Sequence, residues 1–357
     1  MLLSGRKMIS GPSHSGVGLF VRRISGRLIR GASRSIAVCV LVGLLCLANL
    51  CPAQTPESLV HQTIQVDGRS RSYAVYIPDN RGGDRMPLVI VLHGLGGNGV
   101  QALTQGHWLQ AARQHHFALV APDGVLADPG RPESFIGNRR SWNAGPSLGA
   151  SAEAQGVDDV SFLGKVLDKV QRDPAIDQTR AYISGFSDGA AMALRAAAEL
   201  RDRFAAVAPV SNALLVPVAR KPTLPSLLLI WGTADPLNPI TGGQVKRAGK
   251  IYMRPSAAQT LRAWGTALGC SERGSPATLA PGIEEYRLEG CPAGREAKLV
   301  TIAGLGHQWP GGETYVRMIA GPGSNALDAT TFIWGFFATH RLVEEGRRVI
   351  SGPENQE

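Results

Sequence analysis

The segment from Ala181 to Ala193, which reads AYISGFSDGAAMA, constrains the fold more than any other part of this chain. Its apolar start predicts a buried strand, and the alanine-rich run after Gly189 predicts a helix. Between them lies Gly-Phe-Ser-Asp-Gly, a G-x-S-x-G pattern that places the serine on a sharp strand-to-helix turn. Gly185 and Gly189 suit this turn because the two backbones approach closely there. The alternative is a glycine-rich turn with an incidental serine.

Other apolar runs predict further strands that are buried on both faces, as strands of a parallel sheet are. They span residues 87–92, 117–121, 204–210, 227–231 and 298–302, and alternating runs at 62–66 and 71–77 flank an Asp-Gly turn. Helical patterns lie between the strands: about 15 residues ending at His116, residues 160–172, residues 256–268 and a last helix that contains Phe332 and Phe336. The alternation predicts an α/β fold in a single domain, with a mostly parallel central sheet and helices on both faces.

Polar residues follow the ends of four of these strands, where ligands bind in such sheets. They are His93 with the glycines after it, Ser187, Asp235 and His307. A serine hydroxyl needs a base to become a good nucleophile, and the base needs a carboxylate to hold its tautomer. The order Ser, Asp, His along the chain is that of α/β-hydrolases. We therefore expect an α/β-hydrolase fold with Ser187 as nucleophile, Asp235 as acid and His307 as base.

Rival residues exist for two of these roles. His340 is the other histidine after Asp235, but it lies near the end of a helix, where we expect it to be exposed. Asp202 and Asp328 are rival acids that do not follow strand ends.

An oxyanion hole needs two backbone N–H groups that point at the developing charge. We expect one from Asp188, which follows the nucleophile, and the other from Leu95 in the turn after His93. Trp142 and Trp309 are candidates to line a pocket for an acyl or aryl group, and core packing is the alternative for both. His93 itself is expected to be structural.

Net charge argues against a nucleic-acid partner. The formal charge is +9, but residues 1–53 contain seven basic residues and no acidic one, so the rest of the chain carries a net +2. No histidines are clustered with the spacing of metal ligands, so the sequence implies neither a metal nor a cofactor. It makes no prediction of the oligomeric state.

The first 53 residues are expected to form an export signal or disordered leader. Basic residues precede an apolar run of 13 residues, 36–48, whereas a membrane span needs about 20. Cleavage before Gln54 is expected, and an uncleaved membrane anchor is the alternative. Residues 54–345 are then the catalytic domain, and residues 346–357 a disordered tail. The region from Val125 to about Gly156 lacks periodicity and predicts a working loop or lid.

Of the five cysteines, three lie in the expected leader and leave Cys270 and Cys291 as a pair. In an exported chain, an even pair predicts a disulfide, which would stabilise the fold by roughly 3 kcal/mol. Two buried free thiols are the alternative.

From about residue 62 to residue 340 the chain resembles secreted carbohydrate-esterase-type proteins, the LpqC-like group of feruloyl and acetylxylan esterases and polyhydroxybutyrate depolymerases. The resemblance rests on several motifs: PLVIVLHGLGGN from Pro87, SWN from Ser141, GFSDG from Gly185, FAAVAPV from Phe204, GTADP from Gly232, the glycine pair at 242 and 243, and GHQWPGG from Gly306. It implies the same nucleophile, acid and base, and the same cysteine pair.

The chain departs from this family's pattern at three positions. Asp188 stands where Asn or Ala is commoner, and a negative charge there would weaken the oxyanion hole. Leu95 replaces a frequent Cys or Thr, and Trp231 replaces a frequent His. None of these changes removes the nucleophile, the acid or the base.

The sequence therefore predicts a secreted or periplasmic serine esterase, a carboxylic-ester hydrolase that works through an acyl-enzyme. The expected substrates are hydroxycinnamoyl or acetyl sugar esters, or short hydroxyalkanoate esters. Polyester depolymerases usually carry an adsorption module after the catalytic part, and only about 15 residues of this sequence follow the last helix. Alternatives are a polyhydroxybutyrate depolymerase proper, a peptidase or acyltransferase on the same scaffold, and an inactive polysaccharide-binding module. A membrane would be a partner only if the leader stays uncleaved.

Overall fold

The computed structural model describes residues 59–79, 83–135, 137–146, 151–200, 202–247, 250–314 and 317–342. The expected leader and tail, residues 1–53 and 346–357, lie outside these ranges. Residue contacts group Pro56–Glu357 into one unit, with which the following description deals. In the described part of this unit, no helix is both long enough and apolar enough to cross a bilayer.

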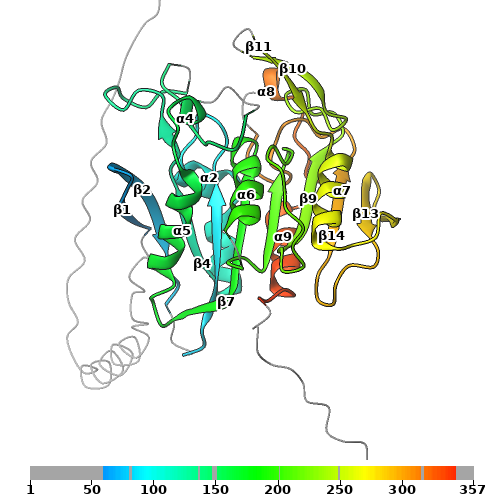
Figure 1. Cartoon of the computed structure of the whole chain (residues 1–357), viewed down its shortest axis with the longest axis horizontal. Coiled ribbons are helices and arrows are strands. Elements are labelled where there is room, and N and C mark those ends of the chain that lie inside the picture. The colour runs from blue at the N-terminus through cyan, green and yellow to red at the C-terminus, as the bar shows by residue number, and fades with distance from the viewer. Residues whose placement is uncertain are drawn as a thin grey trace, which may run out of the picture. The chain divides into compact units, whose positions relative to one another are not determined.

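The described residues form a central sheet of ten strands (Figure 1). The six central strands run parallel to one another, and the two strands at each edge pair antiparallel. The predicted mostly parallel sheet is confirmed. In spatial order the strands are β1 (Val60–Val66), β2 (Arg69–Tyr76), β4 (Ala118–Pro122), β3 (Met86–Leu92), β7 (Ile176–Phe186), β8 (Ala206–Val210), β9 (Ser226–Gly232), β14 (Ala297–Ile302), β13 (Ile283–Leu288) and β12 (Gly274–Ala280).

Helices cover both faces of the sheet (Figure 1). One face packs against α5 (Asp159–Val170), α6 (Asp188–Glu199) and α7 (Ala257–Leu268), and the other against α2 (Gly99–Gln105), α3 (Trp108–His115) and α9 (Ala329–Ala338). Successive side chains of β3 alternate between the two layers, since Leu88 and Ile90 lie in the first core and Val89 and Val91 in the second. Burial on both sides explains why β3 reads as a continuous apolar run.

The prediction of one helix ending at His116 was wrong, because the chain breaks between α2 and α3. His107 adopts a left-handed conformation with φ 54°, which ends the helical path. A Cβ at Gly106 would lie 2.7 Å from the ring of Trp108, so the break brings the backbone close to a buried indole.

Shorter elements lie between the main ones. The aperiodic region contains the paired strands β5 (Val125–Leu126) and β6 (Arg140–Ser141), followed by α4 (Ser151–Ala154). A separate hairpin consists of β10 (Gly243–Arg247) and β11 (Lys250–Arg254), and α8 (Arg317–Ala320) lies after β14.

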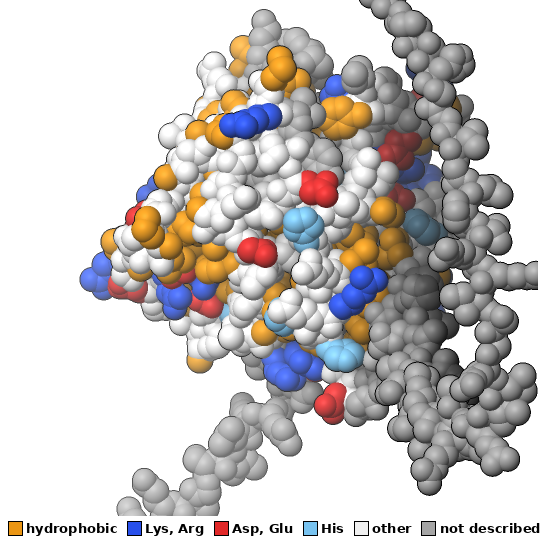
Figure 2. Space-filling view, turned by 180° about the vertical axis from the view of Figure 1, so that it is seen from behind, with side chains coloured by type: hydrophobic (Ala, Val, Ile, Leu, Met, Phe, Trp, Pro, Cys, Tyr) orange, Lys and Arg blue, Asp and Glu red, His pale blue; other side chains and the backbone are white. Residues whose placement is uncertain are grey.

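Charged side chains are mixed on the molecular face seen in Figure 2. Among the described residues on this face, basic and acidic groups are scattered between apolar ones, and they form no broad area of one sign. This distribution agrees with the small net charge outside the first 53 residues.

Candidate active site

Ser187 lies at the turn between β7 and α6, with φ 55° and ψ −116°. This conformation is strained for a residue with a side chain, and the surrounding contacts hold it. A Cβ at Gly185 would collide with the carbonyl oxygen of Gly189, and a Cβ at Gly189 would collide with the carbonyls of Leu92 and His93. Both flanking glycines are therefore required by the close packing of β7, β3 and α6.

A continuous chain of hydrogen bonds joins Ser187, His307 and Asp235. The Ser187 Oγ lies 2.8 Å from His307 Nε2, and His307 Nδ1 lies 2.8 Å from Asp235 Oδ2. A carboxylate can only accept, so Nδ1 carries the proton and Nε2 accepts the bond from the serine hydroxyl. Asp235 and His307 are only 4% and 7% exposed. The arrangement can therefore move a proton from the serine to the imidazole beside a shielded negative charge.

The backbone around Asp235 and His307 fixes both side chains. Asp235 Oδ1 accepts N–H bonds from Leu237 at 2.9 Å and Asn238 at 2.8 Å, which leaves Oδ2 for the histidine. The N–H of His307 donates to the carbonyl of Ala320 in α8, and the ring of Phe186 packs 4.8 Å from the imidazole. Asp235 follows β9 and His307 follows β14, two neighbouring parallel strands whose carboxyl ends share one edge of the sheet.

The two expected oxyanion donors come from different segments, the start of α6 and the turn after β3. Asp188 is the first residue of α6, and the first N–H groups of a helix have no carbonyl partner within that helix. Leu95 follows Gly94, at which a Cβ would lie 3.4 Å from the Cβ of Ser187. The backbone N–H groups of the next two residues already have acceptors, since Gly96 donates to the carbonyl of Arg140 and Gly97 donates to the carbonyl of Gly94.

Both tryptophans proposed for the substrate pocket are buried. Trp142 is 0% exposed and its ring packs against His93, with centroids 5.0 Å apart. Trp309 is also buried, where it packs against Trp108 and donates its indole N–H to Thr330 at 3.1 Å. These positions favour the core-packing alternative for both.

His340 is buried, so the expectation that it is exposed was wrong. Its Nε2 lies 3.4 Å from Glu296, and its Nδ1 bonds to the carbonyl of Phe336 at 2.7 Å. Burial lowers the pKa of this imidazole. His340 thus ties the end of α9 to Glu296, the residue before β14, and takes no part in the hydrogen bonds of Ser187.

Sequence reasoning missed two asparagines at the site. Asn212 follows β8 and donates its side-chain N–H to the carbonyl of Ser187 at 2.8 Å. Asn238 donates its side-chain N–H to the carbonyl of Ser211 at 2.6 Å, and its own carbonyl accepts the indole N–H of Trp231 at 2.8 Å. Asn212 follows a strand end, so the rule that identified the other site residues could have found it. Asn238 does not directly follow a strand end, so this rule could not have found it.

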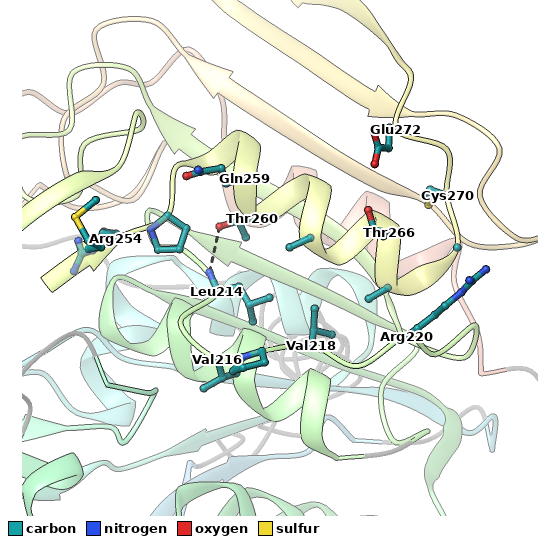
Figure 3. A pocket seen from close by; sticks show the side chains of 16 residues that line it. Leu214, Val216, Val218, Arg220, Arg254, Gln259, Thr260, Thr266, Cys270 and Glu272 are labelled. Carbon is teal, nitrogen blue, oxygen red and sulfur yellow. Dashed lines mark hydrogen bonds between the residues drawn. The ribbon is translucent and has the colours of Figure 1, made fainter.

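Two further features lie apart from Ser187. Cys270 and Cys291 form the expected disulfide. A groove of about 960 Å³ runs between α7 and residues 214–220, where the N–H of Leu214 donates to Thr260 (Figure 3). None of Ser187, Asp235 and His307 lines this groove. Among the residues the structure describes, no three His, Cys, Asp or Glu side chains gather closely enough to hold a metal ion.

The chain is similar to several known esterases. A family model described as Phospholipase/Carboxylesterase matches residues 79–252. The curated protein "Putative esterase NocK" of Nocardia uniformis subsp. tsuyamanensis is 34% identical over 275 residues, which cover 70% of this chain and 73% of that protein. "Probable feruloyl esterase C" of Aspergillus niger is 26% identical over 222 residues, which cover 59% of this chain and 73% of that protein. Among solved structures, the acetyl xylan esterase from Aspergillus awamori matches with a TM-score of 0.49 and 14% identity, over 70% of this chain and 94% of that chain.

Proposed function

Because this chain belongs to the phospholipase/carboxylesterase family of α/β-hydrolases, we propose that it is a serine carboxylic-ester hydrolase that works through an acyl-enzyme. The hydrogen-bonded chain from Ser187 through His307 to Asp235 carries this proposal. The 2.8 Å between Ser187 Oγ and His307 Nε2 suits direct proton transfer, and the 2.8 Å between His307 Nδ1 and Asp235 Oδ2 suits the hydrogen bond that orients the imidazole.

In this mechanism Ser187 Oγ attacks the ester carbonyl while His307 Nε2 takes its proton. Asp235 holds the imidazole in the right tautomer and stabilises the imidazolium that forms. The N–H groups of Asp188 and Leu95 stabilise the oxyanion. His307 then gives its proton to the leaving alcohol, and the acyl group stays on Ser187. Water attacks this ester in the second half, with His307 again as the base.

The substrates that we propose are hydroxycinnamoyl or acetyl esters of sugars, or short hydroxyalkanoate esters. Relatives named as feruloyl and acetylxylan esterases support the first two. We also propose that the protein works outside the cytoplasm, which its disulfide supports, because such bonds persist in oxidising compartments.

The test is a screen of purified protein on p-nitrophenyl esters of increasing chain length, methyl ferulate and a hydroxybutyrate trimer. Ser187→Ala should remove turnover of every substrate and labelling by a fluorophosphonate probe. The matched control is Ser161→Ala, a serine on α5 distant in sequence from the turn, which should keep both. Turnover by Ser187→Ala, or faster cleavage of an amide than of the matching ester, would refute the proposal.

A further inference from the structure

We propose that His93 is a positioning residue that orients the N–H of Leu95 for the oxyanion, and that Trp142 and the carboxylate of Asp188 hold His93 in place. This inference rests on the proposed esterase function. It assigns a role to the histidine that follows β3 and to a tryptophan that is fully buried.

Two hydrogen bonds determine the tautomer of His93. The N–H of Gly124 donates to Nε2 at 2.9 Å, so Nε2 must be the unprotonated nitrogen. Nδ1 therefore carries the hydrogen, and it donates to the carbonyl of Gly94 at 2.7 Å. The ring is only 2% exposed, and burial lowers the pKa of His93 to about 4. The imidazole thus stays neutral at the pH where esters are normally assayed.

The carbonyl of Gly94 belongs to the same peptide as the N–H of Leu95. In a trans peptide these two groups point in opposite directions. A side chain that fixes the carbonyl on one side therefore fixes the N–H on the other. Gly94 lies beside the nucleophile, because a Cβ there would be 3.4 Å from both Phe186 and Ser187. His93 thus sets the direction of the N–H that faces the reacting carbonyl.

Trp142 connects His93 to the other oxyanion donor. Its indole N–H donates to the carbonyl of His93 at 2.9 Å, and its backbone N–H donates to Asp188 Oδ2 at 2.9 Å. Asp188 contributes the second proposed N–H from the start of α6. The two donors therefore belong to one buried network, and the Asp188 carboxylate holds the Trp142 backbone. This contact requires a side-chain acceptor at position 188, which an Ala could not supply.

The decisive experiment compares two amide substitutions of His93. In His93→Asn, the amide nitrogen can occupy the place of Nδ1 and still donate to Gly94. In His93→Gln, the amide oxygen can occupy the place of Nε2 and accept from Gly124, but no donor faces Gly94. Each variant keeps one of the two hydrogen bonds. A merely structural role would therefore affect both variants similarly.

We expect His93→Gln to lower kcat for a p-nitrophenyl ester by about 10- to 100-fold with little change in KM, below the full loss of an oxyanion donor. Its affinity for an alkyl boronic acid, which forms a tetrahedral serine adduct, should fall by a similar factor. His93→Asn should lose less than about 5-fold in both. Equal losses in the two variants, or a loss confined to Tm, would overturn the inference.

Trp142→Phe tests the second part of the network, with Trp264→Phe as its matched control. Both indoles are 0% exposed and each donates to a backbone carbonyl, Trp142 to His93 and Trp264 to Pro225 at 3.0 Å. Both substitutions should lower Tm, but only Trp142→Phe should also lower kcat and boronate affinity. Unchanged kcat in Trp142→Phe would refute its role. If the unmodified protein hydrolyses no ester, the proposed function fails; if it does and these variants behave alike, only this inference fails.

Discussion

The side chain of Asn212 donates a hydrogen bond of 2.8 Å to the backbone carbonyl of Ser187. The same carbonyl accepts the N–H groups of Ala190 and Ala191 at the start of α6. Asn212 therefore helps to hold the nucleophile in a backbone conformation, φ 55°, that residues with side chains seldom adopt.

Asn212→Ala should lower the free energy of unfolding by about 1–2 kcal/mol and should lower kcat more than it raises KM. Asn212→Asp should lower both the free energy of unfolding and kcat further. The carboxylate still accepts the bond from the N–H of Ala213, but its other oxygen would face the carbonyl oxygen of Ser187. Urea unfolding and ester kinetics on the two variants check this order. Wild-type stability in Asn212→Asp would show that the contact does not support the turn.

Asp235→Asn should lower kcat by about 10³- to 10⁴-fold with little change in fold. The amide oxygen can still accept from Leu237 and Asn238, which places the NH₂ group against His307 Nδ1. Nδ1 must then accept, so Nε2 carries the proton and cannot take one from Ser187. Asp328→Asn is the control, because Asn also caps a helix and Asp328 caps α9. A comparable loss of kcat in the control would contradict the assignment of Asp235.

Acidification should destabilise the protein through His93. Burial lowers the pKa of His93 to about 4, and Arg140 adds to this while Asp123 and Glu133 partly oppose it. Between pH 6.5 and 4 the unfolded chain therefore binds a proton that the folded protein does not. The free energy of unfolding should fall by about 3 kcal/mol as the pH drops through this window. Burial also lowers the pKa of His340, which acts in the same direction.

The measurement is the free energy of unfolding of the protein and of His93→Asn at pH 7, 5.5 and 4. The variant starts from lower stability, but it should lose clearly less between pH 7 and pH 4, because one titrating group is gone. Parallel pH dependences of the two proteins would mean that His93 does not titrate in this way.

Two glycines should respond in opposite ways to alanine. Gly189→Ala puts a Cβ against the carbonyls of Leu92 and His93, so α6 must shift away from β3 at a cost of about 3 kcal/mol, with loss of activity. Gly335 lies on the exposed side of α9 with no atom within 4 Å of a new Cβ, and Gly335→Ala should stabilise by about 0.5–1 kcal/mol. Thermal unfolding of both variants tests these two stability changes. A lower Tm of Gly335→Ala would contradict the conclusion that a Cβ at position 335 of α9 meets no other atom.

Local patterns were enough to predict the central strands and the place of the polar residues. Strand β3 is apolar at every position because both of its faces are buried, and β9, which is also buried throughout, is apolar from Leu227 to Trp231. Ser187, Asp235 and His307 each follow a strand, and parallel strands bring such positions to one edge of the sheet.

Features that depend on distant contacts could not be predicted. The burial of Trp142 depends on His93 and Asp188, which lie 49 and 46 residues away in the chain. The break between α2 and α3 follows from a close approach of Gly106 to the rings of Trp108 and Trp309, and only the first of these is local. The hairpin of β12 and β13 was missed because β12 is almost entirely solvent-facing and lacks an alternating pattern.

The reactive side chains are far apart in the sequence, and this separation affects how activity returns after denaturation. Ser187 and His307 are separated by 120 residues and Asp235 and His307 by 72. Contacts this distant in sequence form slowly, because the chain between them must first be ordered. Catalysis cannot begin until β7, β8, β9 and β14 have all paired. During refolding, hydrolysis should therefore reappear later than the circular dichroism of the helices, which makes enzymatic turnover a sensitive reporter of complete sheet assembly.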